Sequence, residues 1–592
     1  MEAKDNKMRT SYYIWELLKY KPWLYLAVIM LWIIKDTIPL IYGVLVKEFF
    51  DILAGKPKLN IGIIGLLFLI IMITVIQISI LHLGFKSSGR HELYISTLLR
   101  RNMLNSILKK AGAKSIPTSV GEAINSFRDD VEILQASVGW LSWLTGQITR
   151  AVAAIVILMT INIKMTILVF APLAAIIVLA QRSEKRVEKN REQSRKATAS
   201  VTGAIGEIFE SVLAIKVSGS KKSIISNLKG LNKKRHRLMV KDSLLSQLID
   251  SIYNNAVNLG TGLVLLLAAY AIKSGSFGVG DFALFVYYLG FVTDSIESTG
   301  NFLVHFQQTG VSIKRIIGLT GSKTDNEIVK HKAIYFKEKD AFKHQKTNEV
   351  EINIKDIELK TLKVKGLSYC YEGFDKGIKD ISFTLNKGEV TVICGRTGCG
   401  KSTLLKALIG LLPADSGKIY WNGNVIENPQ TFFIPPVSAY TSQIPNLFSE
   451  SVKNNILLGI SEETADLEGA INSAVLERDI DELEAGLDTV TGPKGVKLSG
   501  GQLQRVAAAR MFIRKAQLLI FDDISSALDV ETEKALWSRL FNDNKPTCII
   551  VSNRKQVIEQ ADNIILMKDG TIEAQGKLPE LLKTSKEIQM FI

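Results

Sequence analysis

The chain has 592 residues, of which 47% are hydrophobic and 22% charged, with a formal net charge of +15 and a mean hydropathy of +0.17. This length allows several domains, and the composition indicates that apolar and charged segments are separated along the chain, which excludes an evenly polar soluble protein. All four cysteines lie in the C-terminal half, two of them in or beside a glycine-rich loop, so a reducing compartment is favoured over a disulfide framework. The charged, amphipathic N-terminus does not resemble a cleaved signal peptide.

The N-terminal half contains long apolar runs. The clearest is 61–81, which carries no charge for 21 residues, enough to cross a bilayer. Such runs are rare in water-soluble helices, so a membrane domain is favoured over a large soluble helical core. We predict a transmembrane domain over 1–319, with six spans at approximately 20–46, 60–84, 133–160, 164–181, 249–272 and 281–313.

Charged residues interrupt three of these spans. They are Lys35, Asp36, Arg150, Asp294 and Glu297. Because exposure of a charge to lipid is unfavourable, we expect these side chains to face a polar cavity or a neighbouring helix. A substrate pathway and simple pairing between helices both explain them.

The connections between spans predict the topology. The links after spans two and four are long, roughly 86–130 and 182–246, and hold 8 and 16 Lys/Arg, against about 4 in the short links. This bias predicts long connections, both ends of the domain and the C-terminal half on the cytoplasmic side of the cell membrane. Topology then explains most of the basic charge, and a nucleic-acid partner is not expected.

The long connections are rich in helix formers and predict membrane helices that continue into the cytosol. Within them, "VGEAINSFRDDVEIL" (120–134) and "GEIFESVLAIKVSG" (206–219) are predicted to be the turns of two cytoplasmic hairpins. Beyond the last span, 320–360 loses hydrophobicity and gains lysine and glutamate, which predicts a charged linker. From 361 to 592, short β-branched runs alternate with helical ones, as is typical of an α/β domain.

A phosphate-binding loop is predicted within 390–412, "VTVICGRTGCGKSTLLKALIGLL". Gly395, Gly400, Lys401 and Ser402 have the P-loop spacing between a strand and a helix. The glycines allow backbone N–H groups to surround phosphate oxygens, Lys401 adds a positive charge, and the Ser402 hydroxyl suits Mg²⁺. The loop residues expected to bind nucleotide are Gly395, Arg396, Thr397, Gly398, Cys399, Gly400, Lys401, Ser402 and Thr403.

Cys399 is interpreted as a small filler within this loop in preference to a redox switch. Alkylation of its thiol is expected to block nucleotide binding unless nucleotide is already present. Further along, the apolar strand of "LLIFDD" delivers Asp522 to the coordination sphere of the metal. Between these segments, "LSGGQ" opens a strongly helical stretch with a helix start suited to an anion. Its residues are Leu498, Ser499, Gly500, Gly501 and Gln502.

Together these motifs resemble the ATP-binding cassette (ABC) transporter family over nearly the whole chain. The resemblance implies ATP and Mg²⁺ as ligands, adenine stacking on Tyr371 of "LSYCY", and metal and water contacts from Gln443 in the Q-loop segment. A purely structural role for Tyr371 stays open. "SALD" is similar to the D-loop, with residues Ser526, Ala527, Leu528 and Asp529. The expected metal contacts are Ser402, Gln443 and Asp522.

Six spans joined to one C-terminal cassette resemble an exporter-type (type IV) half-transporter. The segments 120–134, 206–219 and 311–316 ("VSIKRI") are similar to its coupling and span-six segments. The family works as a pair of such chains, in which each ATP lies between the P-loop of one cassette and the LSGGQ of the other. The resemblance therefore implies a second half-transporter as partner, beside the lipid bilayer and an unidentified substrate.

Two positions depart from the family pattern. Asp523 stands where the family has a glutamate that polarises the attacking water, and one methylene fewer retracts the carboxylate by roughly an ångström. A misplacement of that size can slow chemistry by about two orders of magnitude. Asn553 stands where the family has a histidine, and an amide cannot carry the charge of the imidazole.

These departures beside an intact LSGGQ predict an ATP-driven exporter or flippase subunit with a slow site of its own, paired with a partner that supplies competent residues. A homodimer with two slow sites is the second hypothesis. A subfamily that works well with aspartate is a third explanation. A regulatory or channel-like membrane protein gated by ATP, with little turnover, is the alternative from another functional class.

Overall fold

The computed structural model describes residues 10–56, 61–110, 112, 120–273, 277–321, 326–334, 358–371, 373, 376–525, 527–542 and 545–592, with the side chains of 173–188 and of ten further helical positions left out. The chain divides into two compact units, which are residues 1–106 with 117–334, and residues 107–116 with 335–592. The predicted linker 320–360 lies mostly outside the described residues.

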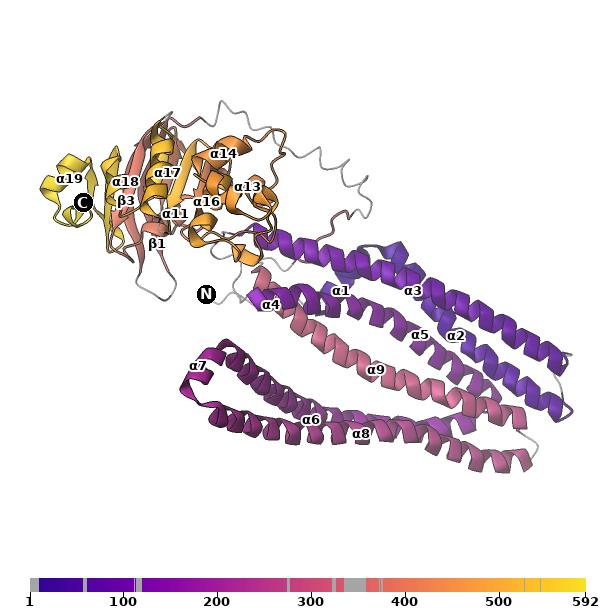
Figure 1. Cartoon of the computed structure of the whole chain (residues 1–592). Coiled ribbons are helices and arrows are strands. Elements are labelled where there is room, and N and C mark those ends of the chain that lie inside the picture. Colours follow the sequence, from indigo (N-terminus) through magenta and orange to yellow (C-terminus); the bar gives the residue numbers. More distant parts are fainter. Residues whose placement is uncertain are drawn as a thin grey trace. The chain divides into compact units, whose positions relative to one another are not determined.

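The first unit is helical (Figure 1). Its elements are α1 (Thr10–Lys19), α2 (Pro22–Leu53), α3 (Ile63–Leu108), α4 (Val120–Asn125), a π-helical turn (Ser126–Asp130), α5 (Val131–Ile161), α6 (Ile163–Glu210), α7 (Val212–Ser218), α8 (Lys221–Lys273) and α9 (Val279–Thr320).

Each of the six predicted spans lies largely on one long helix, namely α2, α3, α5, α6, α8 and α9 in chain order. Among the described residues, α2, α3, α9 and the continuous α4–α5 segment are long and apolar enough to cross a membrane. Shorter apolar stretches, Ile163–Pro172 on α6 and Asn258–Ala269 on α8, lie in the remaining two predicted spans.

The two predicted hairpin turns have different outcomes. The chain bends by 73° between α6 and α7 within 206–219, and α6 and α8 run side by side on either side of this bend (Figure 1). The prediction of a turn over 120–134 is wrong, because that segment is helical throughout. Within its "RDD", Arg128 and Asp129 are exposed, whereas Asp130 is buried, accepts a hydrogen bond from Ser126 Oγ at 2.9 Å and lies 3.5 Å from Arg315 of α9.

The charges within the spans mostly pair. The buried Asp36 carboxylate lies 2.8 Å from Lys35 Nζ, and Arg150 of α5 lies 3.7 Å from Asp294 of α9. The first pair joins consecutive residues of α2, whereas the second joins two helices and favours helix pairing over a substrate pathway for Arg150 and Asp294.

The second unit is an α/β domain with two sheets. The larger has strand order β10-β9-β3-β8-β7-β6, in which all neighbours are parallel except β10 and β9. The smaller sheet is antiparallel, in the order β2-β1-β4-β5. The strands are β1 (Thr361–Cys370), β2 (Gly377–Asn386), β3 (Val390–Gly395), β4 (Ser416–Trp421), β5 (Asn424–Val425), β6 (Ser438–Thr441), β7 (Leu518–Asp522), β8 (Cys548–Val551), β9 (Asn563–Lys568) and β10 (Thr571–Gly576).

Helices pack around the sheets of this unit (Figure 1). The helices of the unit are α11 (Lys401–Leu408), α12 (Pro429–Phe432), α13 (Val452–Leu457), α14 (Leu467–Ser473), α15 (Glu477–Glu482), α16 (Gly500–Phe512), α17 (Val530–Asn542), α18 (Lys555–Glu559) and α19 (Leu578–Thr584). Every residue of β3, β7 and β8 is buried, as expected for parallel strands covered on both faces. The fold is thus a helical transmembrane domain followed by an α/β nucleotide-binding domain.

Candidate functional site

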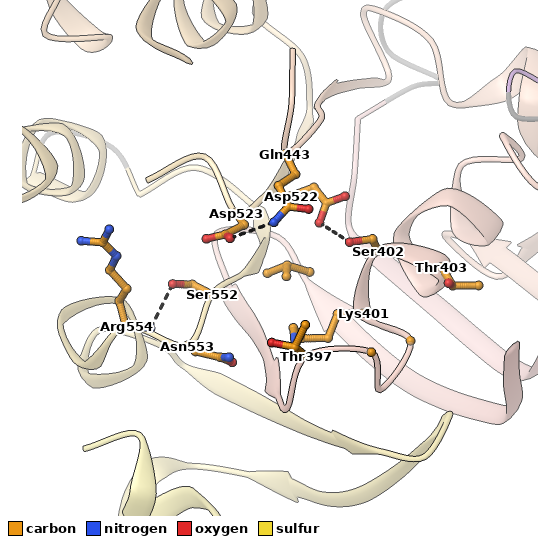
Figure 2. A pocket seen from close by; sticks show the side chains of 13 residues that line it. Thr397, Lys401, Ser402, Thr403, Gln443, Asp522, Asp523, Ser552, Asn553 and Arg554 are labelled. Atoms are coloured by element: carbon orange, nitrogen blue, oxygen red, sulfur yellow. Dashed lines mark hydrogen bonds between the residues drawn. The ribbon is translucent and has the colours of Figure 1, made fainter. Parts of the chain in front are cut away.

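The candidate site lies at the carboxyl edge of the larger sheet. The P-loop follows β3, Gln443 follows β6, Asp522 ends β7 and Asn553 follows β8. Because these strands are parallel and adjacent, their carboxyl ends bring together residues that are far apart in the sequence. They border a cavity of about 470 Å³ (Figure 2). It is lined by Thr397, Gly398, Gly400, Lys401, Ser402, Thr403, Gln443, Asp522, Asp523, Val551, Ser552, Asn553 and Arg554.

The P-loop has the backbone conformation that its glycines predict. Gly395, Gly398 and Gly400 have φ values of +144°, +86° and +103°, which side chains with a Cβ rarely adopt. A Cβ on Gly395 would lie 2.3 Å from the Met567 carbonyl oxygen of β9. Lys401 at the start of α11 donates to the carbonyl oxygens of Gly395 at 2.6 Å and Arg396 at 3.0 Å.

Other predicted P-loop residues make contacts away from the cavity. Arg396 forms an ion pair of 2.6 Å with Glu587 near the C-terminus. Cys399 is only 7% exposed, which fits a filler and means that a thiol reagent reaches it poorly. Tyr371 follows β1, is 38% exposed and packs edge to face with Tyr369, with ring centroids 5.0 Å apart. Its hydroxyl lies 3.3 Å from Thr403 Oγ1, which places the ring near the end of the loop.

Asp522 is held by two hydroxyl groups. Ser402 Oγ donates to Asp522 Oδ1 at 2.8 Å, and the Tyr440 hydroxyl donates to Oδ2 at 3.2 Å. Burial and the Asp522 carboxylate raise the pKa of Tyr440, which keeps this phenol a donor. The hydroxyl and carboxylate oxygens are hard ligands of the kind that Mg²⁺ prefers. Among the described residues no group of three His, Cys, Asp or Glu side chains could hold a metal alone, so an ion here would need phosphate or water ligands as well.

Asp523 has a different environment. Its φ of +54° is in the left-handed region, and its backbone N–H donates to the Val551 carbonyl oxygen of β8 at 3.1 Å. Gln443 Nε2 donates to Asp523 Oδ2 at 3.3 Å (Figure 2). Burial raises the pKa of Asp523, opposed by the hydrogen bond from Gln443. Neighbouring carboxylates at one strand end therefore face different partners.

Asn553 is engaged with the P-loop backbone. Its Oδ1 accepts from the Gly395 N–H at 3.0 Å, and its Nδ2 donates to the Gly395 carbonyl oxygen at 3.0 Å. The side-chain amide thus pairs with both polar groups of one residue on the neighbouring strand. In this arrangement its donor points to the backbone of the loop, and a γ-phosphate would have to displace it.

The signature residues Leu498 to Gln502 do not line this cavity. Ser499 caps α16: its Oγ accepts from Gln502 N at 3.3 Å, and Gln502 Oε1 accepts from Ser499 N at 3.0 Å. Leu498 is buried, while Ser499 and Gly500 are exposed.

Of the predicted D-loop, Ser526 lies outside the described residues. Ala527 N donates to Gln504 Oε1 at 3.1 Å, Leu528 is buried, and Asp529 Oδ1 accepts from Thr532 N at 2.9 Å. The Ala527 carbonyl oxygen would lie 3.2 Å from a Cβ on Gly501, so this loop lies against the signature of its own chain.

Sequence reasoning did not select Tyr440, Ser552 or Arg554. Arg554 forms an ion pair with the buried Glu533 and donates to the Ser525 carbonyl oxygen at 2.8 Å, which ties the Asn553 segment to the start of the D-loop. The run of three polar residues directly after the buried strand β8, of which only Asn553 was selected, was the available signal for Ser552 and Arg554. Tyr440 lies between buried neighbours on β6, and no feature of the sequence singled it out.

The fold and the site define a membrane protein with a P-loop nucleotide-binding domain. Residues 25–296 match the ABC transporter transmembrane region and residues 378–526 match the ABC transporter domain. The chain belongs to the ABC transporter family, as a half-transporter whose ATP-binding domain makes it an ATPase coupled to transport. The two matched regions cover more than two thirds of the sequence.

Individual proteins are similar along most of the chain. An ATP-dependent lipid A-core flippase of Pseudomonas fluorescens is 29% identical over 72% of this chain and 68% of its own. ABC transporter B family member 1 of Dictyostelium discoideum is 26% identical over 83% of this chain, which spans about half (52%) of that relative. The structure of a bacterial Atm1-family ABC exporter with ATP bound has a TM-score of 0.77 at 18% identity, covering 96% of this chain and 99% of that chain. The fold is therefore that of a type IV exporter.

Proposed function

We propose that this chain is one subunit of a dimeric exporter or flippase, that its own ATP site hydrolyses slowly, and that its LSGGQ completes the site of a partner chain. The observation that carries the proposal is the pair Asp523 and Asn553. The first has the shorter acidic side chain, and the second is hydrogen bonded to the Gly395 backbone.

The dimer follows from the position of the signature. The exposed helix start at Ser499 and Gly500 is suited to a phosphate, yet it lies outside the cavity of its own P-loop. A nucleotide held by Lys401 would gain the contacts of a second helix start only from another chain. ATP then favours the closed dimer because it makes contacts there that are absent from the open one.

Mg²⁺ fits the oxygen ligands of Ser402 and Asp522, with Gln443 beside them. When bound, the ion would neutralise phosphate charge during phosphoryl transfer. Lys401 would bind the β- and γ-phosphates, Tyr371 would stack on the adenine, and Asp523 would orient the attacking water from a retracted position. We place the N-terminus and the nucleotide-binding domain on the cytoplasmic side of the cell membrane, since the basic residues concentrate in the long connections.

A heterodimer is favoured over a homodimer because this chain combines a weakened P-loop site with an intact signature. The combination is useful when the partner supplies a glutamate and a histidine at the corresponding positions. A homodimer would place two slow sites in one transporter.

The test places the family's glutamate and histidine at positions 523 and 553 of the full-length chain. Asp523→Glu with Asn553→His should raise the steady-state ATP turnover of the purified protein by about two orders of magnitude, if the retracted carboxylate limits the rate. Lys401→Ala added to the double variant should abolish the gain, which excludes a contaminating ATPase. Wild-type turnover as fast as that of the double variant would overturn the slow site and, with it, the argument for a heterodimer.

A further inference from the structure

A second cavity lies in the transmembrane unit and is lined by residues of α2, α3 and α5, which can be followed in Figure 1. It has a volume of about 460 Å³, within the usual range for small-molecule sites. It lies beside the part of α3 where the long uncharged run ends and the first charges, Lys86 and Arg90, appear. Nothing in the nucleotide chemistry uses it.

The walls of this cavity are aromatic. Trp32 of α2 and Phe85 of α3 pack edge to face with ring centroids 5.7 Å apart, and Trp140 and Trp143 of α5 do the same at 5.0 Å. One face of Trp140 is already stacked on His305 of α9, with centroids 4.4 Å apart. Indole faces attract cations, and Trp is the strongest of the aromatic side chains in this respect.

A single carboxylate lies among these rings. Glu92 of α3 accepts hydrogen bonds from Ser88 Oγ at 3.3 Å and Gln135 Nε2 at 3.4 Å, both long. Among the described residues no Lys, Arg or His forms an ion pair with it. Gly139 lies directly against it: a Cβ there would be 2.7 Å from Glu92 Oε1. Two weak neutral donors leave the negative charge of this half-buried group largely uncompensated.

Lys35 of α2, beside one of the rings, is engaged with another carboxylate. Lys35 Nζ lies 5.0 Å from the Trp32 ring centroid and 2.8 Å from the buried Asp36 carboxylate, which neutralises it. A belt of Trp residues at the membrane surface would explain the rings alone. It does not explain a carboxylate without a cation between them, since an unpaired charge in such a place is unfavourable.

We propose that this cavity binds an organic cation, an ammonium or phosphonium group with apolar substituents. Glu92 supplies the counter-charge, and Trp32, Phe85, Trp140 and Trp143 supply the apolar and cation–π contacts. As a recognition site for exported cargo the inference rests on the proposed function, whereas as a binding site it rests on these contacts alone. The same chemistry fits a free amphiphilic cation and the ammonium headgroup of a lipid.

The test measures binding of tetraphenylphosphonium to the full-length chain in phosphatidylglycerol nanodiscs, without nucleotide, by equilibrium dialysis. Tetraphenylborate, with similar size and opposite charge, is the matched probe. We expect saturable binding of the cation at one site per chain and no competition by the borate. Glu92→Gln, which keeps the size of the side chain, should weaken binding by at least about tenfold, because a charge-assisted contact is lost.

A second variant fills the cavity without touching the carboxylate. A Cβ on Gly89 meets no heavy atom within 4 Å, so Gly89→Val extends into open space and should abolish saturable binding. Gly230→Val on α8 is the matched control, since a Cβ there also meets nothing and its helix lies away from the cavity. It should bind as the wild type does. Equal cation binding by wild type, Glu92→Gln and Gly89→Val, with unchanged thermal unfolding, would overturn the proposal.

A lipid arm separates the two sources of the cation. If an ammonium headgroup is the occupant, nanodiscs that contain phosphatidylcholine should weaken tetraphenylphosphonium binding to the wild type but not to Glu92→Gln. If a free cation is the ligand, the ratio of the two affinities stays the same in both lipids. Because binding needs neither ATP nor a partner, its failure is distinct from a failure of the turnover test on Asp523 and Asn553.

Discussion

Replacing Asn553 tests whether this side chain holds the P-loop. In Asn553→Ala the Gly395 N–H and carbonyl oxygen both lose a partner at 3.0 Å. At about 1 kcal/mol net for each hydrogen bond, the closed loop should lose about 2 kcal/mol. The carbonyl keeps Lys401 Nζ as a second donor, so the N–H suffers most. A histidine can offer only one matched nitrogen to the pair, and Asn553→His should lose about half as much.

The assay is amide hydrogen exchange of the full-length chain without nucleotide. Exchange of Gly395 should speed up by about thirtyfold in Asn553→Ala, since 1.4 kcal/mol corresponds to a factor of ten. Asn424→Ala is the matched control, because Asn424 is exposed on the short strand β5, away from the cavity lining. The reasoning is refuted if Asn553→Ala and Asn424→Ala exchange alike at Gly395, or if Asn553→His exchanges faster than Asn553→Ala.

Three further predictions concern the same domain. Gly395→Ala should abolish binding of a fluorescent ATP analogue, since its Cβ would lie 2.3 Å from the Met567 carbonyl oxygen. The control Gly423→Ala should bind the analogue normally, because Gly423 also has a positive φ, of +86°, but no neighbour within 4 Å. Equal binding by the two variants would refute the clash. Burial raises the pKa of Asp523, so the folded protein is stabilised when this carboxyl is protonated. That stabilisation is lost as pH rises through the pKa of the folded state. Asp523→Asn should therefore raise the melting temperature relative to wild type at about pH 7 but not at about pH 4, and a gain at both would contradict this. N-ethylmaleimide should label the exposed Cys370 first and spare the buried Cys394, Cys399 and Cys548. Burial also raises the pKa of Cys394 to about 12, which keeps its thiol protonated. Mass spectrometry of a Cys370→Ser control should show little labelling.

The gathering of the P-loop, Gln443, Asp522 and Asn553 around one cavity was predictable because each motif is local in sequence. The P-loop is one continuous segment after β3, and the buried run of β7 leads directly to Asp522. Each motif follows a strand of one parallel sheet, so the sheet brings the motifs together without further information. The hydrogen bonds of Asn553 were not predictable, since they depend on the pairing of β3 with β8 across 158 positions.

The transmembrane unit was harder to predict beyond its spans. Charge in "SFRDD" favours a turn when only the local sequence is considered. Yet Asp130 is buried and paired with Arg315 of α9, which lies far along the chain. The aromatic cavity likewise combines Trp32, Glu92 and Trp140 from three helices, and hydrophobic periodicity carries no information about which helices are neighbours.

The two carboxylates after β7 show how environment separates neighbouring residues of one type. Asp522 continues the strand, is buried and is held by Ser402 and Tyr440, so both of its oxygens have fixed hydroxyl partners. Asp523 turns out of the strand at φ of +54°, is half-buried and, among the described side chains, accepts a hydrogen bond from Gln443 alone. Its carboxylate does not reach as far as that of a glutamate. The side-chain amide of Asn553 is hydrogen bonded to the N–H and carbonyl oxygen of Gly395, so it is not available to a γ-phosphate in this arrangement. Under the proposed slow site, both differences favour holding ATP over hydrolysing it. Introducing glutamate and histidine should then increase turnover and loosen the P-loop in the same protein.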